Sequence, residues 1–438
     1  MPARVVVRDD LARSRVTVFF RLLLAIPHLI WISLWTIAAV LAAIANWFAT
    51  LAIGRPPSAL YRFLSAYVRY AVHLSSYLLL AANPFPGFTG EAGSYPIDVE
   101  IAPLERQHRL KTLFRIILVI PAGLVSAVAA GGGGGGGGGR SGSGHGGRVW
   151  TSFVGSGVWI GFLTFVIAFL AWFAVLARGR MPQGFRNTIA WALGYSAQVH
   201  AYLLLLSDRY PSSDPGATGV LGVPPPHPIS LRVEDDLRRS RVTVFFRLLL
   251  AIPHFVWLYL WGVAIEVAII INWFATLILG RTPRWLHRFI SAYVRYQTHL
   301  WAFVTLVANP FPGFVGRPGI YPIDVEIEGP NRQHRLKTLF RAFLAVPAVF
   351  VSWPLLFLLF VVSFLGWFAA LFTGRMPTGF RNLGAWVLRY TAQTNAYLYV
   401  ITDRYPYSGP EAGEAAPEPV EEASPLEGDT AEAAPQLA

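Results

Sequence analysis

The chain has no cysteine among its 438 residues and little charge for its length. The absence of cysteine excludes disulfide bonds, thiolate metal ligands and cysteine nucleophiles. Asp, Glu, Lys and Arg make up 14% of the residues, whereas soluble domains carry roughly 25%. Hydrophobic residues reach 54% and gather in long runs. Scarce charge combined with long apolar runs predicts a membrane protein.

The charges that are present sum to +12. The arginines flank apolar segments, and no separate soluble domain carries a basic face, so we expect no nucleic-acid partner. Such a balance is typical of loop charge that orients a membrane protein. The sequence shows no nucleophile elbow, paired-histidine zinc motif or phosphate-binding loop in its structural context. We therefore predict a protein that is not an enzyme, with no catalytic residue, cofactor or metal site.

One unit recurs four times along the chain. The segment Ser14–His28 is identical to Ser240–His254, and the pattern from Arg247 to Arg281 recurs from Arg341 to Arg375. Tandem units of this kind usually assemble by stacking or by pseudo-symmetry. We expect the units to occupy residues 1–101, 102–211, 229–327 and 328–406.

Each unit begins with a basic prehelix, followed by an apolar run. A helix of about 20 apolar residues crosses the hydrocarbon core of a bilayer. The runs expected to span are Leu29–Ile53, Val158–Ala177, Phe255–Leu279 and Trp353–Thr373.

A second helical run follows in each unit, and whether it spans is less evident. In the first unit a polar stripe that includes Arg62, Arg69 and His73 marks one helix face, as in an interfacial helix or a spanning helix facing protein or water. The aligned run Thr188–Ser207 holds no Lys, Arg, Asp or Glu, which favours spanning. Two spans per unit predict an all-α polytopic fold of about eight transmembrane helices in four two-helix pseudo-repeats, with interfacial prehelices.

Other segments flank these helices. Arg4–Val7 and Tyr95–Ile101 alternate like strands and predict a small β layer on one side. A glycine-rich insertion at about 128–157 should lie outside the hydrocarbon core, because lipid would leave its backbone groups unpaired. Residues 212–228 are a predicted linker, and 407–438 a disordered acidic tail. Lys and Arg are more numerous on the strand side than in the Gly-Arg turns, which predicts a multi-pass protein of the cell membrane with strands and termini in the cytoplasm.

The candidate binding residues lie on the second helices. Arg69, Arg295 and Arg389 fall midway along them at matching positions. A charge at the bilayer centre costs at least ~2.5 kcal/mol and often marks a functional site. His73 and His299 follow one helical turn later on the same face. Gathered together, these groups would bind an anionic lipid headgroup or line a polar path; alternatively, the arginines pair with nearby backbone or carboxylates, or snorkel.

Three further features complete the candidates. Gln393 replaces the histidine in the fourth unit. Glu266 is the only carboxylate inside a predicted first span; it is either a proton or ion site or a partner of Arg295. Asp208 and Asp403, each followed by arginine at the end of a second helix, are expected to form local ion pairs and turns.

The motifs resemble a known family. Ile-Pro-His, Trp-Phe-Ala-x-Leu, Gly-Arg-x-Pro, Ala-Tyr-Leu and Thr-Asp-Arg-Tyr-Pro occur in that order, most completely from Arg341 to Pro406. This order resembles a bacterial membrane family named domain of unknown function 4389, here in tandem copies. Ala348 replaces the histidine of Ile-Pro-His, and the odd units end in Asn-Pro-Phe-Pro. The resemblance implies a membrane location and no assigned reaction.

Three functions follow from these observations. The first is a non-enzymatic scaffold or accessory protein that binds anionic membrane lipid or a membrane-protein partner. The alternative is a transporter or channel, which requires the Arg and His stripes to face one common cavity. The third, a membrane-embedded enzyme, requires acids, bases or metal ligands that converge at one place.

Overall fold

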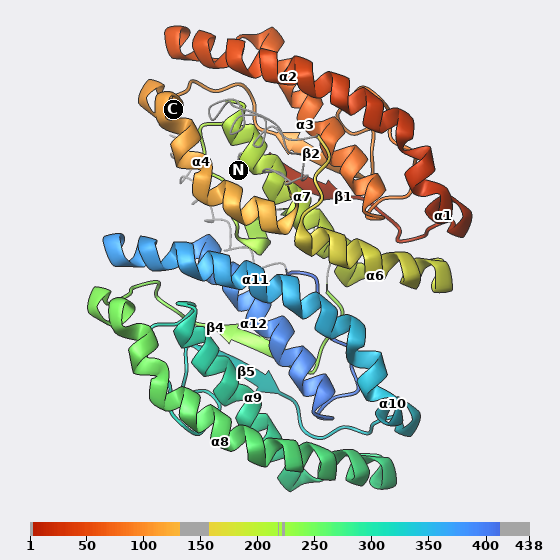
Figure 1. The fold of residues 1–438 in the computed structure, drawn as a ribbon, viewed down its shortest axis with the longest axis vertical. Coiled ribbons are helices and arrows are strands. Elements are labelled where there is room, and N and C mark those ends of the chain that lie inside the picture. The colour runs from red at the N-terminus through yellow and green to blue at the C-terminus, as the bar shows by residue number, and fades with distance from the viewer. Residues whose placement is uncertain (1–2, 132–156, 218, 221–223, 412–438) are drawn as a thin grey trace, which may run out of the picture.

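The computed structural model describes residues 3–131, 157–217, 219–220 and 224–411. Most of the predicted insertion and the predicted tail beyond Glu411 lie outside these residues. The described chain forms three layers: long apolar helices, shorter buried helices, and strands (Figure 1).

The first layer consists of four long helical rods that lie side by side (Figure 1). We call it the rod layer. In the order in which they cross the layer, its rods are α1 (Arg15–Leu24) with α2 (Ile26–Ile53), α4 (Arg109–Ala129) in line with α6 (Phe162–Arg178), α10 (Arg335–Leu339) with α11 (Arg341–Thr373), and α8 (Arg241–Leu279).

Each rod buries only one narrow face. In α2 the inward positions Ile32, Ala39, Ala43 and Asn46 recur every three to seven residues and are mostly small, which allows close packing. His28 and Thr50 are the other buried residues of α2, and its remaining positions, which are mostly apolar, are at least partly exposed. All four rods end at a glycine with positive φ, between 69° and 79°, a conformation that few other residues adopt at a helix end.

The second layer holds the four second helices, which we call the core helices. They are α3 (Ser58–Leu78), α7 (Gln183–Leu203), α9 (Arg284–Val304) and α12 (Thr378–Leu398). Every residue of α7 from Arg186 to Leu203 is buried. The indoles of Trp191 and Trp386 meet edge to face at 4.9 Å and join the two halves of the chain.

The third layer is formed by strands and loops. β1 (Ala3–Val7) pairs antiparallel with β2 (Ile97–Ile101) and parallel with the short β3 (Gly219–Val220). β4 (Ile229–Val233) pairs antiparallel with β5 (Ile323–Ile327). A 3-10 turn at Pro215–Ala217 precedes β3. This arrangement confirms the predicted small β layer.

The two faces of the strands differ in polarity. Ala3 and Val5 of β1 are buried against the helices, while Arg4 between them is exposed. Glu100 of β2 and Glu326 of β5 are exposed in the same way. The outer face of the strand layer is therefore charged, in contrast to the rod layer.

The halves also exchange their terminal segments. Asp214, after α7, accepts a hydrogen bond from Asn382 of α12 (2.8 Å). Reciprocally, the carbonyl of Ser408, after α12, accepts one from Thr188 of α7 (2.9 Å). Packed chain continues to Glu411, so the predicted boundary between the fourth unit and the tail falls too early.

Four of the described helices are long and apolar enough to cross a membrane: α2, α4, α8 and α11. The predicted first span of the second unit, Val158–Ala177, is shorter than expected, since α6 has 17 residues and begins at Phe162. The core helices do not meet the same criteria of length and composition. The prediction of eight spans is therefore not confirmed.

Candidate functional site

The outer surface of the rod layer is a continuous run of exposed apolar side chains. On α8, Leu248 is 67% exposed, Tyr259 73% and Ile278 71%. Among the described core helices only Trp285 and Trp301 expose a large apolar side chain, and strands β1, β2, β4 and β5 expose none. Apolar patches larger than a few hundred Å² mark surfaces that contact membrane or another protein. We call this surface the apolar face.

The apolar face is longer than a bilayer core is thick. α8 has 39 residues, which corresponds to ~58 Å of helix, against roughly 30 Å of hydrocarbon. Between Arg241 and Gly280, Glu266 is its only exposed charge, because Arg247 is buried.

Exposed arginines stand at both ends of the rods, and we call them the rim arginines. They are Arg15, Arg109, Arg241 and Arg335 at the starts and Arg55, Arg180, Arg281 and Arg375 after the ends. Those at the starts also cap a neighbouring rod. Arg109 donates to the carbonyl of Ala52 (3.0 Å), and Arg335 to that of Ile278 (2.9 Å). The rods therefore alternate in direction, and both edges of the apolar face are basic.

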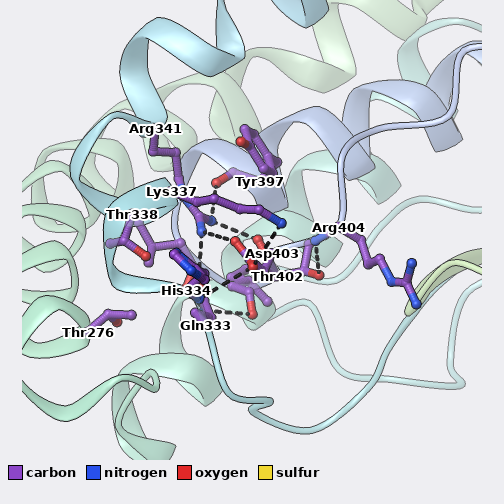
Figure 2. A network of polar contacts seen from close by, with 12 residues as sticks. Thr276, Gln333, His334, Lys337, Thr338, Arg341, Tyr397, Thr402, Asp403 and Arg404 are labelled. Atoms are coloured by element: carbon purple, nitrogen blue, oxygen red, sulfur yellow. Dashed lines mark hydrogen bonds and ion pairs between the residues drawn. The ribbon is translucent and has the colours of Figure 1, made fainter. Parts of the chain in front are cut away.

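A second set of arginines is buried where the rods meet the core helices. The set contains one residue from each unit: Arg21, Arg115, Arg247 and Arg341. Figure 2 shows the fourth, whose Nη1 donates to the carbonyls of Tyr397 (2.9 Å) and Thr402 (2.7 Å). Its Nη2 donates to Gln333 (2.8 Å) and to the carboxylate of Asp403 (3.0 Å). Each arginine of the set satisfies carbonyls at and beyond the end of a core helix, where a cation is favoured.

Sequence reasoning missed the role of this set because it searched for charges inside the second helices. The available signal was the recurrence of one arginine in all four units. Sequence reasoning also predicted local ion pairs for Asp208 and Asp403, which was wrong. Their carboxylates pair with Arg115 at 2.7 Å and Arg341 at 3.0 Å, across two helices, instead of forming only local pairs.

The predicted stripe of the first and third units bonds to strands. The Nε of Arg69 donates to the carbonyl of Val99 in β2 (3.2 Å), and the Nε2 of His73 contacts Asp98 (2.8 Å). The third unit repeats this geometry, with Arg295 on Val325 (3.0 Å) and His299 on Asp324 (2.8 Å). These residues attach each strand to its core helix.

Arg389 and Gln393 of the fourth unit bond elsewhere. Arg389 is 3% exposed; it forms an ion pair with Glu411 and donates to the carbonyl of Gly409 (2.5 Å). Gln393 donates to the carbonyl of Ile229 (3.0 Å) and accepts from the N–H of Tyr407 (2.9 Å). The predicted stripes thus lie against different segments: β2 in the first unit, β5 in the third, and residues 407–411 together with β4 in the fourth.

Glu266 lies on the opposite side of α9 from the strands. Its side chain is exposed on α8, while the guanidinium of Arg295 is directed to the backbone of β5. No ion pair joins these two residues, both of which the structure describes, so the predicted pairing is wrong.

The two buried aspartates, Asp98 and Asp324, have a shifted pKa. Burial by itself raises the pKa of each carboxyl. Hydrogen bonds from a histidine and from two backbone N–H groups lower it by more, so the net pKa lies below its ordinary value. The backbone donors to Asp98 are Gly93 and Val99. Both aspartates are therefore held as carboxylates.

These layers define a tandem-repeat α-helical protein with apolar helices long enough to enter a membrane. The family model described as a domain of unknown function (DUF4389) matches residues 15–89, 156–213, 241–315 and 335–408. The chain belongs to this family, in four tandem copies, as its motifs indicated. The matches cover the core helices and every rod helix except α4, and they leave out the strands. Comparison with curated proteins and with solved structures gave no match.

The buried arginines predict a large loss of stability on substitution. In Arg341→Met two carbonyls lose their charged donor and the carboxylate of Asp403 loses the closer of its two cations. Breaking a largely buried pair costs about 3–5 kcal/mol. We expect a clearly lower unfolding midpoint in detergent, measured by thermal unfolding of the full chain.

The matched control is Lys337→Met, which removes the other cation on Asp403. Lys337 is 55% exposed and lies 3.5 Å from that carboxylate, so its loss should cost no more than about 1 kcal/mol. Equal effects of the two substitutions would contradict the capping role of Arg341.

The lowered pKa of Asp98 and Asp324 predicts that the stability of the fold decreases at acidic pH. A carboxyl with a depressed folded pKa stabilises the fold above its ordinary pKa of 3.8, and this contribution is lost as the pH falls through the folded value. Asp98→Asn with Asp324→Asn should therefore be less stable than wild type at pH 7, and the difference should shrink below about pH 4. Thermal unfolding from pH 7 to pH 3 measures it.

Glu100→Gln with Glu326→Gln provides the control, because these carboxylates are exposed on the same strands. If the glutamate double variant lost as much stability as the aspartate double variant at every pH, the contact of the buried carboxylates with histidine would not be the cause.

Proposed function

We propose that the protein is a non-enzymatic membrane scaffold whose rods lie along one leaflet of the cell membrane. The apolar face would sit among the acyl chains, and the rim arginines would bind anionic headgroups. The observation that carries this proposal is that the rods hold most of the exposed large apolar side chains, while the exposed charges of the rods lie near their ends, apart from Glu266.

The position of the strands favours rods in the membrane plane over rods that cross it. Arg69, midway along α3, bonds to Val99 of β2, so the strand lies beside the middle of the core helix. Rods that crossed the bilayer would bring Arg4 and Glu100, on the outer strand face, close to mid-depth. A charge there costs several kcal/mol, whereas rods in the plane leave that face in water.

The basic rims agree with the same orientation. A helix that crosses the membrane places its two ends on opposite surfaces, and the positive charge then gathers on one of them. Here both ends of the rods carry exposed arginines. Rods in the plane place all of them at one surface, and the anionic cytoplasmic leaflet is the favourable one. The polar strand face would then be open to a protein partner in the cytoplasm.

The transporter alternative has weaker support from the geometry. It needs the arginine and histidine stripes to line one path, whereas Arg69, Arg295 and Arg389 bond to three different segments. Vesicles that contain the protein should accordingly show no more solute or ion flux than protein-free vesicles. A saturable solute flux would favour the transporter.

The rim arginines predict a preference for anionic lipid. Each contributes about 1 kcal/mol, so Arg281→Gln with Arg375→Gln should lower the enrichment of phosphatidylglycerol over phosphatidylcholine by roughly 25-fold. The lipid retained by protein purified from mixed micelles, quantified by mass spectrometry, gives this ratio. The loss should shrink at high salt.

Arg4→Gln with Arg232→Gln is the matched control, because it removes the same charge from the outer face of β1 and β4. We expect it to keep the wild-type lipid ratio. An equal loss in both variants would mean that net charge alone, and not the rim, selects the lipid.

A further inference from the structure

A cavity of about 820 Å³ lies between the rods α8 and α11, and we call it the rod pocket. Its floor comes from the core helices α9 and α12, including Trp301 and Leu388. Along α11 its lining extends from Leu356 to Trp367, which corresponds to ~16 Å of helix. Its volume is within the range typical of ligand sites.

The mouth of the rod pocket opens on the apolar face. Phe245 and Leu248 of α8 are 59% and 67% exposed, and Phe360 and Phe364 of α11 are 65% and 55% exposed. All four line the pocket. A ligand would therefore enter from the side that the proposed function places among acyl chains.

Most groups that line the pocket are apolar. Gln297 and Asn395 satisfy each other on the floor, with a hydrogen bond of 2.8 Å. The hydroxyl of Ser363 is buried and has no hydrogen-bond partner in the structure. Arg247 also lines the pocket, but its Nη1 donates to the carbonyls of Phe303 and Ala308. The lining thus suits an apolar group and offers few fixed polar contacts.

The other half of the chain shows what fills the corresponding space. Ser75 aligns with Trp301, and His200 aligns with Asn395. Between them lies Trp159, whose backbone N–H donates to the hydroxyl of Ser75 (2.9 Å) and whose indole stacks on His200 at 4.4 Å. Trp159 is 1% exposed. In the N-terminal half, an apolar side chain of the protein itself fills this position.

Between residues 224 and 411, which the structure describes, no side chain plugs the rod pocket in this way. Trp159 belongs to the segment that joins the broken rod α4–α6, whereas α11 runs unbroken from Arg341 to Thr373. Trp301 is larger than Ser75 but lines the cavity without filling it. An open apolar pocket in one half therefore corresponds to a plugged one in the other.

We propose that the rod pocket binds one acyl chain of a membrane phospholipid, in the place that Trp159 fills in the other half. This inference rests on the proposed function, because the membrane supplies the ligand through the mouth on the apolar face. The elongated lining and the few polar contacts fit a hydrocarbon chain, and they leave the headgroup at the rim.

Native mass spectrometry of the full chain with a phosphatidylcholine carrying two sixteen-carbon chains tests the proposal. A zwitterionic lipid keeps the charge of the rim arginines out of the measurement. Wild type should retain one tightly held lipid on release from detergent. Ser363→Trp should fill the pocket and lower that affinity at least tenfold, and Thr391→Phe should act in the same direction if the first variant does not fold.

Two further variants sharpen the result. Phe357→Trp, on the same rod but outside the pocket lining, should retain lipid as wild type does. Trp159→Ala should open the corresponding space and raise the number of retained lipids to two. Equal retention in wild type, Ser363→Trp and Thr391→Phe would overturn the proposal, as would a pocket that takes soluble aromatic compounds in preference to lipid.

The outcome is separable from that of the proposed function. A protein that floats with vesicles and prefers phosphatidylglycerol, yet holds no lipid sensitive to Ser363→Trp, would refute the pocket and leave the scaffold intact. A protein that does not associate with vesicles would refute the scaffold itself.

Discussion

The structure depends on one constraint: each rod is apolar around most of its surface but buries only one narrow face. Exposing the remaining surface to water is unfavourable, by about 25 cal/mol for each Å² of apolar area. Side-by-side packing of four rods covers their flanks and leaves one broad apolar face. The core helices and strands are then confined to the opposite side, where the charged groups lie.

The buried arginines make this layered arrangement specific. A helix end leaves several carbonyls without partners, and burying them unsatisfied is unfavourable. Arg21, Arg115, Arg247 and Arg341 each cross from a rod to the carbonyls at and beyond the end of a core helix. Because four equivalent contacts recur, the same rod-to-core geometry recurs in every unit. Reciprocal capping of rod ends, by Arg15 with Arg109 and by Arg241 with Arg335, then sets neighbouring rods in opposite directions.

Much of the fold followed from the residues alone. The four units, the long apolar runs and the strands near Val5 and Val99 were predictable because periodicity and repetition are local properties of the sequence. The role of the second helices was not, since a polar stripe such as Arg69 and His73 has the same spacing whether it faces water, lipid headgroups or a strand. Only the tertiary structure shows that it faces β2.

The pairing of Glu266 with Arg295 failed for the same reason, because repeat alignment gives the position of a residue and not the side of the helix that it faces.

Depth in the bilayer is the property that decides between an embedded layer and crossing helices, and the absence of native cysteine makes it measurable. Leu249, Leu260 and Ile271 are exposed on α8 and are spaced by three full turns, so they share one face over ~33 Å. Each would be replaced by cysteine and spin-labelled in vesicles, and its exposure to oxygen would be compared with its exposure to a water-soluble nickel chelate. Rods in the membrane plane predict the same shallow depth at all three positions, whereas a label at the bilayer centre flanked by one near each surface would contradict the account.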